Sequence, residues 1–136
     1  ERLSLYKQLS KISNEKSLKT FKDNLIDRFG PLPKQVKELL ITLRVKWLAG
    51  SIGIKRLVIK KGGCIGYFIE NQNDKIFKSD LFSLFLINVQ KENIGAYIKE
   101  KKSRKGIKLV LIIEDVNSIS NLYNKIKLLI KDFSSS

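Results

Sequence analysis

The chain of 136 residues contains no histidine and no methionine, and its single cysteine is Cys64. Histidine is the commonest general base and the commonest metal ligand at neutral pH, so its absence removes most nucleophilic triads and zinc sites. A lone cysteine forms no internal disulfide. The sequence therefore argues against an enzyme or metal protein of the usual kinds, and we expect no cofactor in this segment.

Long apolar runs are also missing. A membrane-spanning helix needs about 18 or more consecutive apolar residues, and the longest candidate, Leu81 to Val89, is about half that length. The opening residues Glu1-Arg2-Leu3-Ser4 lack the apolar core of a signal peptide. These absences predict a soluble, cytoplasmic protein with no membrane partner. Because no initiator methionine is present and the chain opens within a helical pattern, we expect a segment of a longer protein.

Acidic residues are scarce relative to basic ones, 13 against 27, which gives a net charge of +14. The apolar share of 43% and the length predict one globular domain over residues 1–136. A basic excess attracts polyanions and acidic surfaces, although a generic lysine-rich surface explains the same numbers. Tyr97 is the one aromatic residue near the basic run 99–105, which gives base stacking little support. The possible polyanion contacts are Lys60, Lys61, Lys101, Lys102, Arg104 and Lys105.

Helical spacing dominates residues 1–53. A short apolar stripe from Leu5 and Tyr6 to Ile12 predicts a first helix, and a second stripe ends at Phe29. Asn14 is a suitable N-cap for the second helix. The third helix, about 33–52, has an apolar stripe wide enough to be buried against two neighbours.

The heptapeptide DRFGPLP, residues 27–33, separates the second helix from the third. Gly30 stands at the position of a C-terminal cap, Pro31 prevents continuation of the helix, and Pro33 suits the first position of the next one. We interpret the segment as a structural corner that does no chemistry. Phe29 is expected to fill this corner, with Arg28 and Asp27 holding the turn.

Strand spacing replaces helical spacing in residues 54–136. Two hairpins are indicated by apolar, β-branched runs on either side of Gly- or Lys-rich turns. Two helices are indicated by apolar periodicity, the first preceded by a Ser79-Asp80 cap. The expected strands are 57–59, 65–69, 96–101 and 107–113, and the expected helices are 81–89 and 119–133. This order predicts an α+β fold: N-terminal helices, then two strand-strand-helix units that form a small antiparallel sheet with helices packed on it.

No catalytic constellation emerges from the motifs. A nucleotide-binding P-loop has the form G-x-x-x-x-G-K-[ST] before a helix, whereas the glycines of residues 62–66 lie between strands. The adjacent carboxylates Glu114 and Asp115 end a strand, where neighbours point to opposite faces. Cys64 begins a strand in basic surroundings that could lower its pKa, but packing is the simpler role.

Three segments of the first sixty residues resemble the C-terminal domain of bacterial transcription-repair coupling factors. They are ERLSLYKQLSKI (1–12), LIDRFGPLPKQVKELL (25–40) and LAGSIGIKRLVI (48–59). The family pattern combines an R-L-x-L-Y-K opening, the corner L-x-D-R-F-G-x-x-P, and a helix leading into G-I. The matching residues are Arg2, Leu3, Leu5, Tyr6, Lys7, Asp27, Arg28, Phe29, Gly30, Pro31, Pro33, Gly53 and Ile54.

The resemblance implies a module of an ATP-dependent DNA translocase that displaces stalled RNA polymerase and recruits the repair protein UvrA. It places ATP and magnesium in upstream motor domains of the parent, outside this segment. It further implies that this domain is a non-catalytic regulatory clamp, which docks on the UvrA-binding domain of the same chain and masks it. The basic charge departs from the acidic docking surface expected in the family. The alternative is a basic module that contacts DNA non-specifically.

Overall fold

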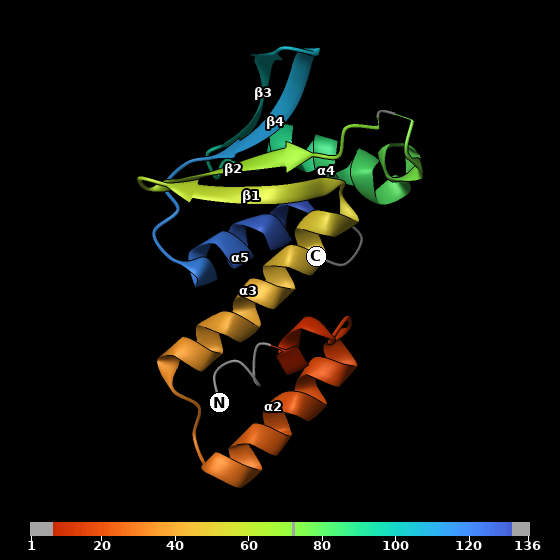
Figure 1. Cartoon of the computed structure of the whole chain (residues 1–136). Helices are drawn as coiled ribbons and strands as arrows, with labels where there is room; N and C mark the ends of the chain where they lie inside the picture. Colours follow the sequence, from red (N-terminus) through yellow and green to blue (C-terminus); the bar gives the residue numbers. More distant parts are fainter. Residues whose placement is uncertain (1–6, 72, 132–136) are drawn as a thin grey trace.

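The computed structural model describes residues 7–71 and 73–131, which form an α+β fold as expected (Figure 1). Residues 7–10 are helical, and the rest of the expected first helix falls largely outside the described residues. The elements in chain order are α2 (Glu15–Phe29), α3 (Lys34–Ser51), β1 (Ile54–Lys60), β2 (Gly63–Phe68), the short 3-10 helix η1 (Lys75–Lys78), α4 (Asp80–Lys91), β3 (Ala96–Ser103), β4 (Gly106–Ile113) and α5 (Ile119–Leu129).

The four strands form one antiparallel sheet in the order β1-β2-β4-β3. The two predicted hairpins are both present, and β2 and β4 join them at the centre of the sheet, with Cys64 opposite Ile113. In the first hairpin, the turn residues Lys61 and Gly62 both have positive φ, 38° and 78°. This left-handed conformation matches the twist of the flanking strands and favours glycine.

The main core lies on one face of the sheet, which we call the inner face. Helices α3, α4 and α5 pack there, and Figure 1 shows α3 and α5 beneath β1. Alternate strand residues supply the sheet side of this core, because successive side chains of a strand point to opposite faces. Its fully buried members include Ile52, Phe85, Leu111, Ile113, Leu122, Ile126 and Leu129.

A second, smaller core joins α2 to the N-terminal half of α3. Its buried residues are Leu9, Leu18, Leu32 and Leu40. At the protein surface an ion pair also links these two helices: the guanidinium of Arg44 on α3 donates to both carboxylate oxygens of Glu15 on α2, at 2.6 and 3.1 Å. Helix α3 therefore packs against two neighbours, as its wide apolar stripe predicted.

The DRFGPLP segment is a corner between α2 and α3. Gly30 adopts φ +81° and its N–H donates to the carbonyl of Ile26 at 2.8 Å, which closes α2. Pro33 occupies the N-cap of α3, one residue before the expected position.

The role expected for Phe29 is wrong. Its side chain is 71% exposed, and Leu32, at 9%, is the residue of the corner that enters the smaller core. Phe29 is the last residue of α2, so no following turn of this helix lies against its ring. Arg28 lies over the Phe29 ring, 5.3 Å from its centroid, and Asp27 is exposed on the same last turn.

We expect Gly30→Ala to destabilise the fold by about 1–3 kcal/mol, because the ψ of −162° places Gly30 in a region open almost only to glycine. Open space surrounds the position, so the cost is backbone strain and not a clash. Gly50→Ala is the matched control, since Gly50 lies within α3 with equally open surroundings and should gain about 0.5–1 kcal/mol. Urea unfolding measures both changes, and a loss of stability in both variants would contradict this account of Gly30.

Candidate functional site

Reactive groups are sparse in the part of the chain that the structure describes. That part contains no group of three or more acidic, cysteine or histidine side chains that could hold a metal ion. Burial raises the pKa of the Cys64 thiol to about 11, so the basic surroundings do not activate it. At neutral pH the thiol is protonated and packed against the core, as a packing role requires.

The predicted polyanion contacts do not form one patch. Lys60 and Lys61 lie at the β1–β2 turn, whereas Arg104 and Lys105 form the β3–β4 turn. The antiparallel pairing of β2 with β4 places these two turns at opposite ends of the sheet. Lys101 and Lys102 are neighbours on β3, so they point to opposite faces.

The sheet face opposite the helices is a second surface, which we call the open face. Its side chains alternate along the strands with those of the inner face, and they do not belong to the main core. The register aligns them in rows across the sheet, with Tyr67, Val110 and Lys99 in one row and Ile65, Ile112 and Tyr97 in the next. The open face consists of Arg56, Val58, Lys60, Ile65, Tyr67, Lys108, Val110, Ile112, Tyr97, Lys99 and Lys101.

Tyr67 lies at the centre of a cationic cluster on the open face. The guanidinium of Arg56 sits 4.6 Å from the centroid of the Tyr67 ring, and the ammonium of Lys101 sits 5.2 Å from it. Lys101 also donates a hydrogen bond to the Tyr67 hydroxyl at 3.2 Å, and this bond lowers the pKa of the phenol. Val110, which pairs with Tyr67 across β2 and β4, lies beside the ring and is almost fully buried.

Acidic groups lie at the margins of this surface. Glu70, just after β2, accepts hydrogen bonds from Lys55 at 3.2 Å and Lys108 at 3.3 Å, and these bonds lower its pKa. At the other end, partial desolvation raises the pKa of Tyr97, and the nearby Glu114 carboxylate raises it further.

A depression of about 460 Å³ borders Tyr97 at that end of the open face. The β1–β2 turn forms one side of it, and strands β2, β3 and β4 form the rest. Its side chains combine basic and apolar groups with two carboxylates: Lys60, Lys61, Ile65, Tyr97, Lys99, Ile112, Glu114 and Asp115.

Of the predicted polyanion contacts, Lys60 and Lys101 lie on this face, but sequence reasoning missed its other basic residues and Tyr67. Tyr67 and Lys101 are 34 residues apart in the chain, and Lys108 follows the basic run on the next strand. The alternation of strand residues was a usable signal for which side chains share a face. No short-range pattern in the sequence predicts the pairing of β2 with β4, which brings Tyr67 close to β3 and β4.

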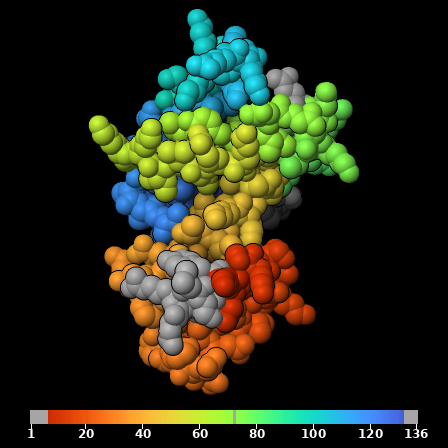
Figure 2. Space-filling view, viewed as in Figure 1, coloured from red at the N-terminus to blue at the C-terminus, as the bar shows by residue number. Residues whose placement is uncertain are grey.

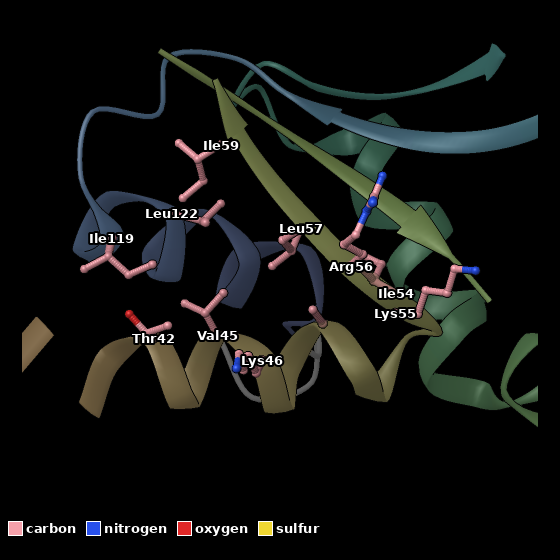
Figure 3. Close-up of a pocket in the computed structure, with 11 residues that line it drawn as sticks. Thr42, Val45, Lys46, Ile54, Lys55, Arg56, Leu57, Ile59, Ile119 and Leu122 are labelled. Carbon is pink, nitrogen blue, oxygen red and sulfur yellow. The ribbon is translucent and has the colours of Figure 1, made fainter. Parts of the chain in front are cut away.

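The edge strand β1 forms a groove with α3 and α5 (Figure 3). Its volume is about 480 Å³. Leu57 and Ile59 point toward the helices, where Val45 and Leu122 lie, while Arg56 points away from them. Polar and basic side chains of Thr42, Lys46, Lys55 and Arg56 surround this apolar floor. Ile59 is 52% exposed, and in Figure 2 the β1–β2 hairpin forms a band above α3.

The fold defines a small α+β domain whose described surface carries a groove beside β1 and a sheet face that combines basic and aromatic side chains. The chain belongs to the TRCF domain family, whose model matches residues 1–79. This match confirms the resemblance drawn from the corner and the flanking helices. Among the described helices, none combines the length and apolar character that crossing a membrane requires.

The curated relatives are bacterial transcription-repair-coupling factors. The protein of Rickettsia conorii is 34% identical over 101 residues, 73% of this chain and 9% of that protein. The protein of Buchnera aphidicola is 31% identical over 132 residues, which is 91% of this chain and 15% of the relative. The chain therefore spans only a small part of the relatives it matches.

A solved structure has the same fold. The crystal structure of the C-terminal domain of a transcription-repair coupling factor aligns with a TM-score of 0.70 at 22% identity. The alignment covers 93% of this chain and 77% of that one, so it includes the second half, where the sequence motifs carried no resemblance. The likeness confirms the α+β architecture over the aligned 93% of the chain.

Proposed function

We propose that this chain is the regulatory C-terminal domain of a transcription-repair coupling factor. In this proposal, the parent is an ATP-dependent DNA translocase that displaces stalled RNA polymerase and recruits UvrA in the cytoplasm. The domain docks on the UvrA-binding domain of the same protein and masks it until the motor engages. Family membership is the observation that carries the proposal.

The structure offers a surface suited to such docking. The groove between β1, α3 and α5 has an apolar floor and a basic rim, the usual anatomy of a protein interface. It suits a partner that presents an apolar segment flanked by acidic groups, which agrees with the charge of +14 on this chain. The role needs reversible burial of a surface and no reacting group on this domain.

Deletion of this domain from the full-length protein should strengthen UvrA binding. Intramolecular coupling of this kind is worth about 5–150-fold in affinity. Biolayer interferometry with immobilised UvrA compares the intact and truncated proteins, and the 136-residue chain, added back separately, should lower the affinity again. Unchanged UvrA affinity after the deletion would overturn the clamp role.

Ile59→Asp tests whether the groove is the docking surface. A carboxylate on the floor of the groove should disrupt docking, so the full-length variant should bind UvrA as tightly as the truncated protein does. Ile107→Asp on β4 is the matched control, because Ile107 is also an exposed strand isoleucine, at 60%, but lies outside the groove. Equal effects of the two substitutions would place the docking surface elsewhere.

A further inference from the structure

We propose that the open face binds single-stranded nucleic acid. Tyr97 and the Arg56–Tyr67 pair provide flat surfaces for bases, and the neighbouring lysines contact phosphates. The inference goes beyond the regulatory role, because it concerns the opposite face of the sheet from the core helices and a different kind of ligand. Its evidence is the charge, the rings and the register of the open face.

The charge of the open face suits a polyanion. Five basic side chains project from it, on three strands, without an acidic side chain among them: Arg56, Lys60, Lys99, Lys101 and Lys108. The nearby acidic groups lie at its ends. Glu70 at one end is bound by Lys55 and Lys108, and Glu114 and Asp115 at the other end line the depression beside Tyr97. Phosphates that follow the face from one end to the other would meet lysines from β1, β3 and β4.

The rings are placed for stacking. Tyr97 is 42% exposed and borders the depression at one end of the face, which leaves room for a base beside it. Arg56 lies over Tyr67, and a guanidinium held in this way offers a planar surface for a base. Tyr67 and Tyr97 are two strands and two residues apart, roughly 12 Å by ordinary sheet spacing. Two bases of an extended strand can therefore occupy both positions.

A single strand fits these features better than a duplex or an acidic protein. Stacking on a side chain requires a base face that is free, and the bases of a duplex are stacked on one another. An acidic protein surface would use the lysines but would leave the two aromatic positions without a role. Four-stranded sheets with aromatic side chains on an uncovered face are a known solution for single-stranded ligands.

Fluorescence anisotropy with the 136-residue chain tests the proposal. The probes are a labelled oligothymidine, an abasic strand of equal length, a duplex of equal length and a polyglutamate peptide. We expect the oligothymidine to bind at least about fivefold more tightly than the abasic strand, because each stacked base contributes measurably. Equal affinities for these two probes, or tighter binding of the duplex or the peptide, would overturn the proposal.

Two pairs of variants separate stacking from charge. Tyr97→Ala should weaken oligothymidine binding by at least about fivefold and leave the abasic strand unaffected, whereas Tyr97→Phe should retain the affinity. The double variant Lys99→Gln, Lys101→Gln should reduce the log–log salt slope by about 1.4. Its control, Lys16→Gln with Lys19→Gln, removes the same charge from exposed positions on α2 and should leave the slope unchanged.

The nucleic-acid binding measurements are independent of the UvrA experiment. Tyr97 and Lys99 do not line the groove, so their substitution should leave UvrA affinity in the full-length protein unchanged. A salt slope that falls equally in both lysine double variants would show a diffuse surface charge and would overturn the open-face site. Circular dichroism of each variant confirms that the fold is retained.

Discussion

Phe85→Ala is expected to destabilise the domain by about 3–5 kcal/mol, the usual cost of removing a buried phenylalanine from a core. The ring is fully buried, and its centroid lies 6.2 Å from that of Phe68 and 5.6 Å from that of Phe82. The contact with Phe68 joins α4 to β2, whereas Phe82 is a neighbour on the same helix. Because small domains have only about 5–15 kcal/mol of stability, the variant should unfold at much lower urea concentrations, with a similar m-value.

Ile87→Ala, on the same helix, is the control for this loss. Its side chain is half exposed, and alanine is the better helix former, so the change should cost less than about 1 kcal/mol. Equal losses in the two variants would mean that α4 does not present Phe85 to the sheet. The pair thus tests the orientation of α4 as well as the size of the core.

Asn88→Asp is expected to cost more than about 3 kcal/mol at neutral pH. Asn88 is fully buried on α4, and its amide nitrogen donates to the carbonyls of Leu129 and Lys131, both at 2.9 Å. These bonds tie α4 to the end of α5. Aspartate would replace the donor with a carboxylate oxygen that faces two carbonyl oxygens in a buried site, so repulsion and desolvation both oppose folding.

Asn124→Asp provides a control with the same change in charge. Asn124 is exposed on α5, so this substitution should alter stability by no more than about 0.5 kcal/mol. Thermal and urea unfolding of the two variants give the comparison. A small effect at position 88 would mean that the link between α4 and the end of α5 contributes little to the fold.

The local elements of this fold could be predicted because their signals lie within a few residues of each other. Asn14 caps α2 by accepting from the backbone N–H of Ser17, and Ser79 caps α4 in the same way through Phe82. Gly30 and Pro31 end α2 wherever the helix packs, because their constraints are those of their own backbone. The same applies to the two hairpin turns.

The candidate surfaces could be predicted only in part. The sequence showed an excess of lysine and placed six basic residues together as possible contacts, but strand direction separates the two turns that carry most of them. Phe29 was expected to be covered, yet whether a residue at a helix end is buried depends on where the neighbouring helix lies. Neither the direction of a paired strand nor the burial of a helix end can be inferred from a window of four or five residues.

The sequence by itself showed that the chain contains no histidine and that a corner forms at Gly30. It also gave the order of helices and strands and the family to which the chain belongs. The tertiary structure alone decided the pairing of β2 with β4, which builds one sheet from two hairpins. That pairing brings Lys101 to Tyr67 and so assembles the open face. The physical reason is that capping and periodicity are local, whereas strand order follows from burying the inner face under three helices.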